Sequence, residues 1–161
     1  MPRLETLSEA QRRMLQMFPC MEHDDTPWAP VRKPLSESRV ALVTSAGLHL
    51  RGDQPFITDL KGGGDSSYRV IPRGTPAADI IQSHVSIGFD HAGIYRDINV
   101  TFPMDRLEEL REQGVIGSLA HNYYSFMGAL RDASKVVDET GPEVARKMLD
   151  EGVDVALLTP T

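Results

Sequence analysis

"RVALVTSAG", residues 39–47, is the stretch that decides the fold of this chain. An apolar run that ends in small polar residues is typical of a buried strand followed by a loop at the sheet edge. Four more short apolar segments come later, at residues 68–72, 97–103, 114–120 and 153–160. Apolar strands without strict alternation are typical of parallel sheets, which are covered on both faces.

Helical patterns separate these segments. One opens at Thr75, which can cap the first amides, and another covers residues 104–114 and closes at a glycine. Two more helices are expected, over residues 124–139 and after a capping box formed by Thr140 and Glu143. This alternation predicts an α/β fold, with a mainly parallel sheet and helices on both faces in a Rossmann-like three-layer arrangement.

Residues 1–38 have a different pattern. A helix is expected from Thr6, whose hydroxyl would form a capping box with Glu9, and the prolines of residues 23–38 favour an extended arm. We therefore predict an N-terminal helix and a Pro-rich arm over residues 1–38, and one α/β domain over residues 39–161. Such a helix and arm can reach a neighbouring copy, so a homo-oligomer is expected.

Composition limits the classes of partner. The chain of 161 residues carries a formal net charge of −6, which disfavours nucleic acid and anionic membranes. No apolar run approaches the roughly 20 residues of a membrane helix, and the N-terminus lacks the apolar core of a signal peptide, so a cytoplasmic protein is expected. Cys20 is the single cysteine, which excludes an internal disulfide and a cysteine-based zinc site. Thiol chemistry therefore needs Cys20 or another polypeptide.

Polar side chains follow the predicted strands, and residues after parallel strands meet at one edge of a sheet. Four of the five histidines lie in such loops. His121 ranks first, because it directly follows a strand and precedes a predicted helix, and His84 and His49 come next. Histidine at its ordinary pKa suits proton transfer, but a solvated or hydrogen-bonded histidine is the commoner case for any single position.

The sequence carries little or no signal for three other kinds of site. "GGGDSS", residues 62–67, is followed by a strand and has no Lys-Ser/Thr pair, so a nucleotide phosphate loop is not supported. A Ser-His-Asp hydrolase lacks its G-x-S-x-G turn. No metal is predicted, because the candidate ligands lack H-x-x-x-H spacing on a helix. Those candidate ligands are His49, His84, His91 and His121, with Asp53 or Asp90.

The residues also carry a family resemblance. The stretches "SRVALVTSAGLHLRGDQPF", "GDSSYRVIPRGTPAADIIQSHVSIGFD", "DINVTFPMDRLEELREQGVIGSLA", "YYSFMGAL" and "GPEVARKMLDEGVDVALLTP" occur in this order. Together they resemble the selenoprotein B family of glycine, sarcosine, betaine and D-proline reductases. The resemblance runs from about Leu35 to the end of the sequence.

The resemblance implies a component of a reductase that cleaves a carbon–nitrogen bond beside a carboxylate. In that family the nucleophile is a selenocysteine or cysteine that follows a strand like "VALLTP", and electrons return through thiol exchange with a partner protein. No cofactor is expected in this chain, and the nucleophile is expected beyond Thr161 or from a partner. Two explanations stay open for its absence: translation that ended at a UGA codon, or a naturally short paralogue.

The resemblance also implies a substrate side of the site. His121 or His84 would supply or remove the proton on the leaving nitrogen, and Arg51, Arg73 or Arg106 would pair the substrate carboxylate. The further substrate-binding candidates are Ser45, His49, Asp65, Ser66 and Tyr124. The alternative is a non-catalytic small-molecule-binding or assembly module of the same fold.

Overall fold

The computed structural model describes residues 3–17, 24, 27–59, 63–86 and 91–161. These residues divide into two units, Met1–Pro30 and Val31–Thr161, each of which is described by itself. No helix in the described ranges is long and apolar enough to cross a membrane.

The first unit holds a 3-10 turn, Leu4–Thr6, and helix α1, Glu9–Gln16. The predicted start at Thr6 is wrong, because Ser8 caps this helix instead. The Ser8 hydroxyl accepts from the Gln11 amide at 3.4 Å, and the Gln11 side chain accepts from the Ser8 amide at 3.1 Å. Thr6 turns its hydroxyl back to the Arg3 carbonyl, so the capping box lies two residues later than expected.

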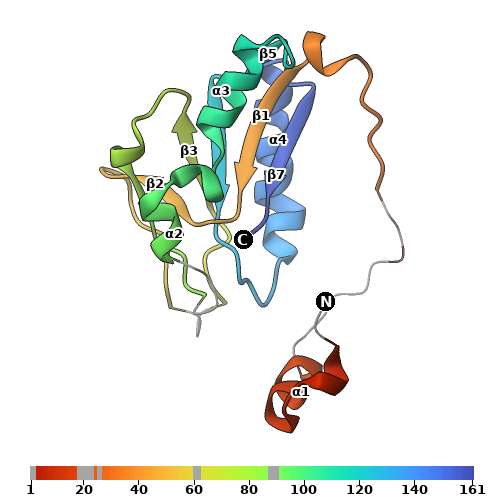
Figure 1. Cartoon of the computed structure of the whole chain (residues 1–161), viewed down its shortest axis with the longest axis vertical. Coiled ribbons are helices and arrows are strands. Elements are labelled where there is room, and N and C mark those ends of the chain that lie inside the picture. The colour runs from red at the N-terminus through yellow and green to blue at the C-terminus, as the bar shows by residue number, and fades with distance from the viewer. Residues whose placement is uncertain (1–2, 18–23, 25–26, 60–62, 87–90) are drawn as a thin grey trace. The chain divides into compact units, whose positions relative to one another are not determined.

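The second unit is built on a five-stranded sheet with β1, Arg39–Thr44, inside it (Figure 1). On one side of β1, β5 (Ser118–Leu119) pairs with its start and β6 (Asn122–Phe126) with its end, both parallel. On the other side β7, Val155–Thr159, runs parallel along the whole strand. The outermost strand β3, Tyr68–Pro72, is antiparallel to β6. The predicted α/β fold and mostly parallel sheet are confirmed.

A separate antiparallel pair joins β2, Leu48–Leu50, to β4, Ile80–Gln82. The sequence predicted a helix here from Thr75, and that prediction is wrong. Only a 3-10 turn forms, at Ala77–Asp79, before the chain extends into β4. Two adjacent isoleucines favour a strand once a partner edge is available, and that pairing overrides the helix-start signal.

Two more segments differ from their predictions. Residues 97–103, predicted as a strand, contain the 3-10 helix Ile98–Val100, in which the Asn99 amide donates to the Asp97 carboxylate. Residues 124–139, predicted as a helix, begin inside β6 and become helical only from residue 134, where a short helical stretch and the π-helix Val136–Thr140 lead into α4. In both segments the spacing of apolar residues is compatible with a helix and with a strand, and tertiary packing decides which of the two forms.

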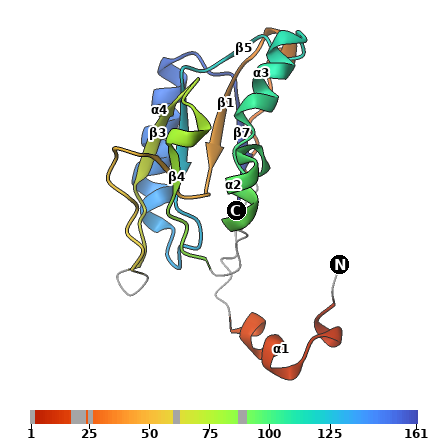
Figure 2. The same ribbon diagram turned by 60° about the vertical axis from the view of Figure 1, so that its left-hand side comes forward.

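Helices lie on both faces of the sheet. Helices α2 (His91–Arg96) and α3 (Met104–Glu112) lie on one face, and α4 (Gly141–Asp150) lies on the other (Figures 1 and 2). Helices α3 and α4 were predicted, but the expected capping box of α4 does not form. The Thr140 hydroxyl donates to the Ser66 carbonyl at 2.8 Å, and Glu143 accepts from the Tyr68 hydroxyl at 2.6 Å. These bonds tie α4 to β3.

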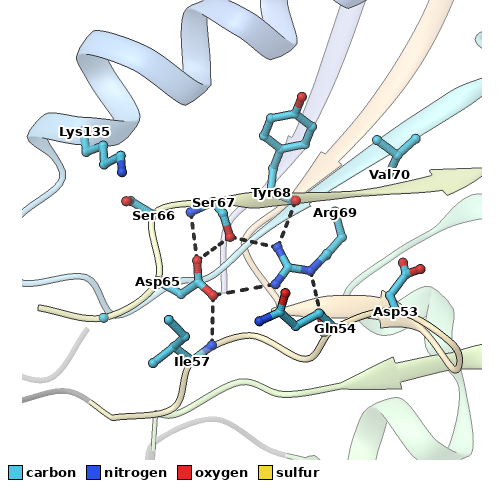
Figure 3. A pocket seen from close by; sticks show the side chains of 11 residues that line it. Asp53, Gln54, Ile57, Asp65, Ser66, Ser67, Tyr68, Arg69, Val70 and Lys135 are labelled. Carbon is cyan, nitrogen blue, oxygen red and sulfur yellow. Dashed lines mark hydrogen bonds and ion pairs between the residues drawn. The ribbon is translucent and has the colours of Figure 1, made fainter. Parts of the chain in front are cut away.

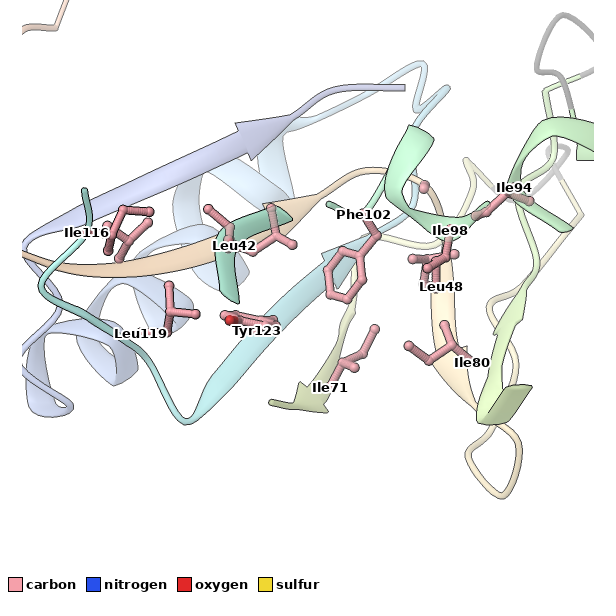
Figure 4. Packing of buried hydrophobic residues seen from close by; sticks show 13 residues of the cluster. Leu42, Leu48, Ile71, Ile80, Ile94, Ile98, Phe102, Ile116, Leu119 and Tyr123 are labelled. Atoms are coloured by element: carbon pink, nitrogen blue, oxygen red, sulfur yellow. The ribbon is translucent and has the colours of Figure 1, made fainter. Parts of the chain in front are cut away.

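The hydrophobic core lies between the sheet and the α2–α3 layer (Figure 4). Leu42 of β1 packs there with Phe102 and Tyr123, all at most 1% exposed, and the ring of Phe102 meets Tyr123 edge-on at 5.8 Å between centroids. Leu48 and Ile80 extend the cluster to the β2–β4 pair. This core holds the carboxyl ends of the parallel strands in fixed positions.

Candidate functional site

The carboxyl ends of three parallel strands meet at one edge of the sheet. Ser45 follows β1, Gly128 lies just after β6, and Thr161 follows β7. The Ser45 hydroxyl accepts from the Thr161 amide at 2.8 Å, and the Ser45 carbonyl accepts from the Gly128 amide at 2.7 Å. The loops after these strands are therefore tied into one cluster, as expected for the edge at which α/β proteins place their sites.

His84 joins this cluster from the segment after β4. Its side chain is buried, at 7% exposed. A Cβ atom on Gly128 would lie 2.8 Å from His84 Nε2, 2.7 Å from the Thr161 carbonyl oxygen and 3.0 Å from the Ser45 carbonyl oxygen. Only glycine at position 128 therefore lets these three groups converge, and we call Ser45, His84, Gly128 and Thr161 the edge cluster.

The protonation of His84 follows from its surroundings. The Ser86 amide donates to His84 Nδ1 at 3.1 Å, so the proton of the neutral ring lies on Nε2, the atom beside Gly128. Burial lowers the pKa of His84, and the charge of His91 lowers it further. His84 therefore presents a neutral N–H donor to the edge cluster near pH 7.

An apolar groove of about 270 Å³ opens next to the edge cluster. Val43 of β1, Leu130 and Val136 line it on the α4 side of the sheet, together with Leu158 and Pro160. Leu158 of β7 is 66% exposed. The groove adds an apolar surface to a cluster whose other groups are polar.

Asp65 and Ser66 lie elsewhere, in a polar pocket of about 680 Å³ beside β3 (Figure 3). The Asp65 carboxylate is 6% exposed and accepts from the amides of Ile57 and Ser67, both at 2.9 Å. The Ser67 hydroxyl also donates to it, and Arg69 lies 3.7 Å away. Burial acts to raise the pKa of Asp65, but these hydrogen bonds outweigh it and hold the pKa below its ordinary value.

Arg69 belongs to a network of hydrogen bonds in the same pocket. Its guanidinium donates to the carbonyls of Gln54 at 2.8 Å and Pro55 at 3.2 Å, and to the Ser67 hydroxyl at 2.8 Å. It also stacks over the Phe56 ring at 4.2 Å from the centroid. Asp65 and Arg69 thus hold residues 54–57 against β3, while Ser66 lines the pocket from the other side.

Two predicted substrate-binding residues lie in the protein interior. His49 of β2 is 3% exposed, with Nε2 at 2.9 Å from the Ser83 hydroxyl and Nδ1 at 2.8 Å from the Leu50 carbonyl. Tyr124 of β6 is buried with its ring edge-on to Tyr68, and burial raises its pKa. Both side chains stabilise the pairing of strands and are enclosed by protein.

His121 lies at the opposite end of the sheet from the edge cluster. It is exposed and comes just before β6, because the strand predicted to end there is followed at once by another parallel strand. Its amide donates to the Glu151 carboxylate at 3.0 Å, at the end of α4. The structure therefore brings together Ser45 and His84 but not His121.

The predicted arginines are engaged at the surface. Arg51 follows β2 and donates to the Ala78 carbonyl at 2.6 Å. Arg73 lies 3.2 Å from Glu108, and Arg106 lies 2.9 Å from Glu109. None of these three arginines belongs to the edge cluster.

Metal binding has no support in the described part of the chain. Within it, no three residues of the His, Cys, Asp and Glu types are placed to hold a metal ion. His91 instead contacts the Gln82 side chain at 3.0 Å, and Asp53 accepts from the Leu50 amide at 3.4 Å. Asp90 and Cys20 lie outside the described residues.

Sequence reasoning missed Gly128 and Arg69. Gly128 fell inside a predicted helix, where a glycine has no special meaning. The aromatic run before it, residues 123–126, was the available signal, because Tyr and Phe favour strands and a glycine after a strand marks a turn or close approach. Arg69 gave no signal, since its partners at residues 54–57 are set by the tertiary fold.

A mostly parallel sheet with a polar cluster at its strand ends defines the class: a mixed α/β protein whose candidate site is formed by the loops after the strands. A family model described as glycine/sarcosine/betaine reductase selenoprotein B matches residues 11–161. The chain therefore belongs to the glycine/sarcosine/betaine reductase selenoprotein B family. No solved structure matches it.

Curated relatives agree with this assignment. The chain is 43% identical over 132 residues to the D-proline reductase subunit gamma of Acetoanaerobium sticklandii, covering 82% of this chain and 52% of the relative. It is 28% identical over 144 residues to the sarcosine reductase complex component B subunit beta of Peptoclostridium acidaminophilum, covering 89% and 33%. A glycine reductase complex component B subunit gamma, from Carboxydothermus hydrogenoformans, is 28% identical with the same coverage. The chain thus spans about half, or a third, of these relatives.

Proposed function

We propose that this chain contributes to a reductase that breaks the bond between the α-carbon and the nitrogen of a small amino acid or N-substituted derivative by reduction. The family assignment over residues 11–161 carries this proposal. D-Proline is our first choice of substrate, because the D-proline reductase subunit shares 43% identity with the chain. A Rossmann-like arrangement of the whole protein belongs to the same proposal and is supported by the helices on both faces of the sheet.

The edge cluster is the proposed substrate site. His84 Nε2–H would donate a hydrogen bond to the substrate carboxylate, with Ser45 beside it. Proton transfer to the leaving nitrogen suits His84 less well. A histidine acts as a general acid in its charged form, and burial disfavours that form. We therefore propose a binding role for His84 in place of proton transfer.

The attacking group is proposed to come from elsewhere in the whole protein or from a partner. It would be a selenolate or thiolate that bonds to the α-carbon as the carbon–nitrogen bond breaks, and the nitrogen would leave as a protonated amine. A thiol of a partner protein would then attack the selenium or sulfur, so that the carbon is released in reduced form and the thiol is oxidised to a mixed selenosulfide or disulfide. The relatives' names support partner proteins, since two of them are components of reductase complexes. A homo-oligomer stays part of the proposal.

Thermal unfolding of the full chain tests the substrate site. D-Proline should raise the melting temperature, because a ligand that binds only the folded state stabilises it. Glycine, sarcosine and betaine are the comparison ligands. The absence of a shift with all four ligands at saturating concentration would contradict the proposed site.

Two histidine variants provide matched controls. His84→Ala should abolish the ligand-induced shift, whereas His121→Ala should retain it, because His121 lies at the other end of the sheet. A shift that survives in His84→Ala but is lost in His121→Ala would reject the edge cluster as the site.

The second candidate is a binding or assembly module without chemistry of its own. The apolar groove beside the edge cluster favours it, since Leu158 is 66% exposed on β7. A module of this kind would show none of the four ligand shifts while still associating with partner proteins.

A further inference from the structure

A separate cavity of about 310 Å³ lies between the β2–β4 pair and α2. Its floor is apolar and formed by Leu48, Ile80, Ile94 and Ile98, all buried (Figure 4). This volume is at the lower end of the range for small-molecule sites. The floor fits a short hydrocarbon body.

The charged residues that line this cavity are all positive. Arg51 and Arg96 line it, and no acidic residue does so in the part of the chain that the structure describes. Arg51 donates to the Ala78 carbonyl and lies 3.9 Å from Asp79, but both side chains are more than half exposed, which weakens that ion pair. Arg96 has no ion pair with any described residue. The cavity therefore offers two guanidinium groups above an apolar floor.

Gln82 adds a polar group to the wall. Its side-chain oxygen lies 3.0 Å from His91 Nδ1, which fixes the orientation of the amide. Its amide nitrogen is buried and has no hydrogen-bond partner among the described residues. The contribution of Gln82 to the lining is therefore to pack the wall, and the charged groups of the cavity are the two arginines.

We propose that this cavity binds a small carboxylate with an apolar body and no ammonium group. Guanidinium groups match a carboxylate with paired hydrogen bonds, and the isoleucine floor excludes water from the hydrocarbon part. An amino acid of the same skeleton binds more weakly, because the lining offers no carboxylate to pair with its ammonium group. The site is independent of the edge cluster and of the proposed reductase function.

Ligand-observed NMR on the full chain tests this site with three probes of one carbon skeleton: 4-methylpentanoate, leucine and 4-methyl-1-pentanol. The carboxylate should bind at least about tenfold more tightly than leucine, which adds the ammonium group, and than the alcohol, which lacks the charge. Equal affinity of the three probes, or no binding of the carboxylate up to about 10 mM, would overturn the proposal.

Arginine variants locate the site. Arg96→Gln should weaken 4-methylpentanoate binding by about tenfold, and Arg51→Gln should act in the same direction. Arg106→Gln is the matched control, because Arg106 lies outside the cavity and pairs with Glu109. Unchanged binding in both cavity variants would reject the site. His84→Ala should bind the probe normally, which separates this proposal from the edge cluster.

Discussion

Tyr68 and Tyr123 belong to neighbouring strands, but their hydroxyl groups have different surroundings. Tyr68 donates to Glu143 at 2.6 Å and so joins β3 to α4. Tyr123 is 1% exposed, and its hydroxyl has no hydrogen-bond partner among the described residues. A buried hydroxyl without a partner costs free energy, so the value of Tyr123 to the fold lies in its ring.

Replacing Tyr123 by Phe should leave the free energy of unfolding unchanged or raise it by about 1 kcal/mol, because an unsatisfied hydroxyl is removed and the ring is kept. Tyr68→Phe is the matched variant and should lower it by about 1 kcal/mol, through loss of the bond to Glu143. Urea unfolding measures both changes. A destabilised Tyr123→Phe would show that its hydroxyl has a partner.

At the scale of elements, hydrogen bonds from a few side chains hold the loops against the sheet. Arg69 of β3 anchors residues 54–57 through bonds to backbone carbonyls and through the Phe56 ring. Glu151 at the end of α4 accepts from the Asn122 side chain at 2.6 Å and from the His121 amide. These contacts join segments far apart in the sequence, so each acts only after the strands have paired.

Arg69→Lys tests how much Arg69 stabilises the protein by anchoring residues 54–57. Lysine keeps the charge but cannot reproduce the fork of guanidinium donors, so the free energy of unfolding should fall by about 2 kcal/mol. Arg106→Lys is the control and should change it by less than about 0.5 kcal/mol, because that arginine is 58% exposed and pairs with Glu109 at the surface. Chemical denaturation of both variants measures the difference, and equal effects would contradict a structural role for Arg69.

For the whole molecule, half-buried Tyr68 and buried Tyr123 set the response to alkaline pH. Burial raises the pKa of Tyr68 to about 12, and the hydrogen bond to Glu143 raises it in the same direction. The pKa of Tyr123 is also raised to about 12, mainly by burial. A pKa that is higher in the folded state than in the unfolded chain means that the folded state favours the protonated group. That stabilisation is complete below the unfolded value near 10 and is lost as the pH rises through the folded value.

The free energy of unfolding should therefore be steady between about pH 8 and 10 and fall between about pH 10 and 12. Phenolate absorbance should show two of the tyrosines ionising together with unfolding in this window. Tyr68→Phe should make the fall less steep, since one of the two raised groups is removed. A free energy of unfolding that stays level up to pH 12 would contradict the raised pKa values of these two tyrosines.

Local signals in the sequence determined the family, the α/β class and the elements with strong periodicity. Strands β1, β3 and β7 and helices α3 and α4 were predicted, because apolar runs and helix-end glycines act over a few residues. The placement of Ser45 after β1 followed from the same reasoning. Signals of this kind depend on neighbours in the chain and can be read without the fold.

Only the tertiary structure decided that β4 and β6 are strands, and their pairing determines which residues form the edge cluster. Both segments were predicted as helices or loops, and both become strands because a partner edge satisfies their backbone groups. The pairing of β6 with β1 moves His121 to one end of the sheet and carries Gly128 to the other, where His84 meets Ser45. Hydrogen bonding between distant strands leaves no local trace in the sequence, and so the composition of the edge cluster required the folded chain.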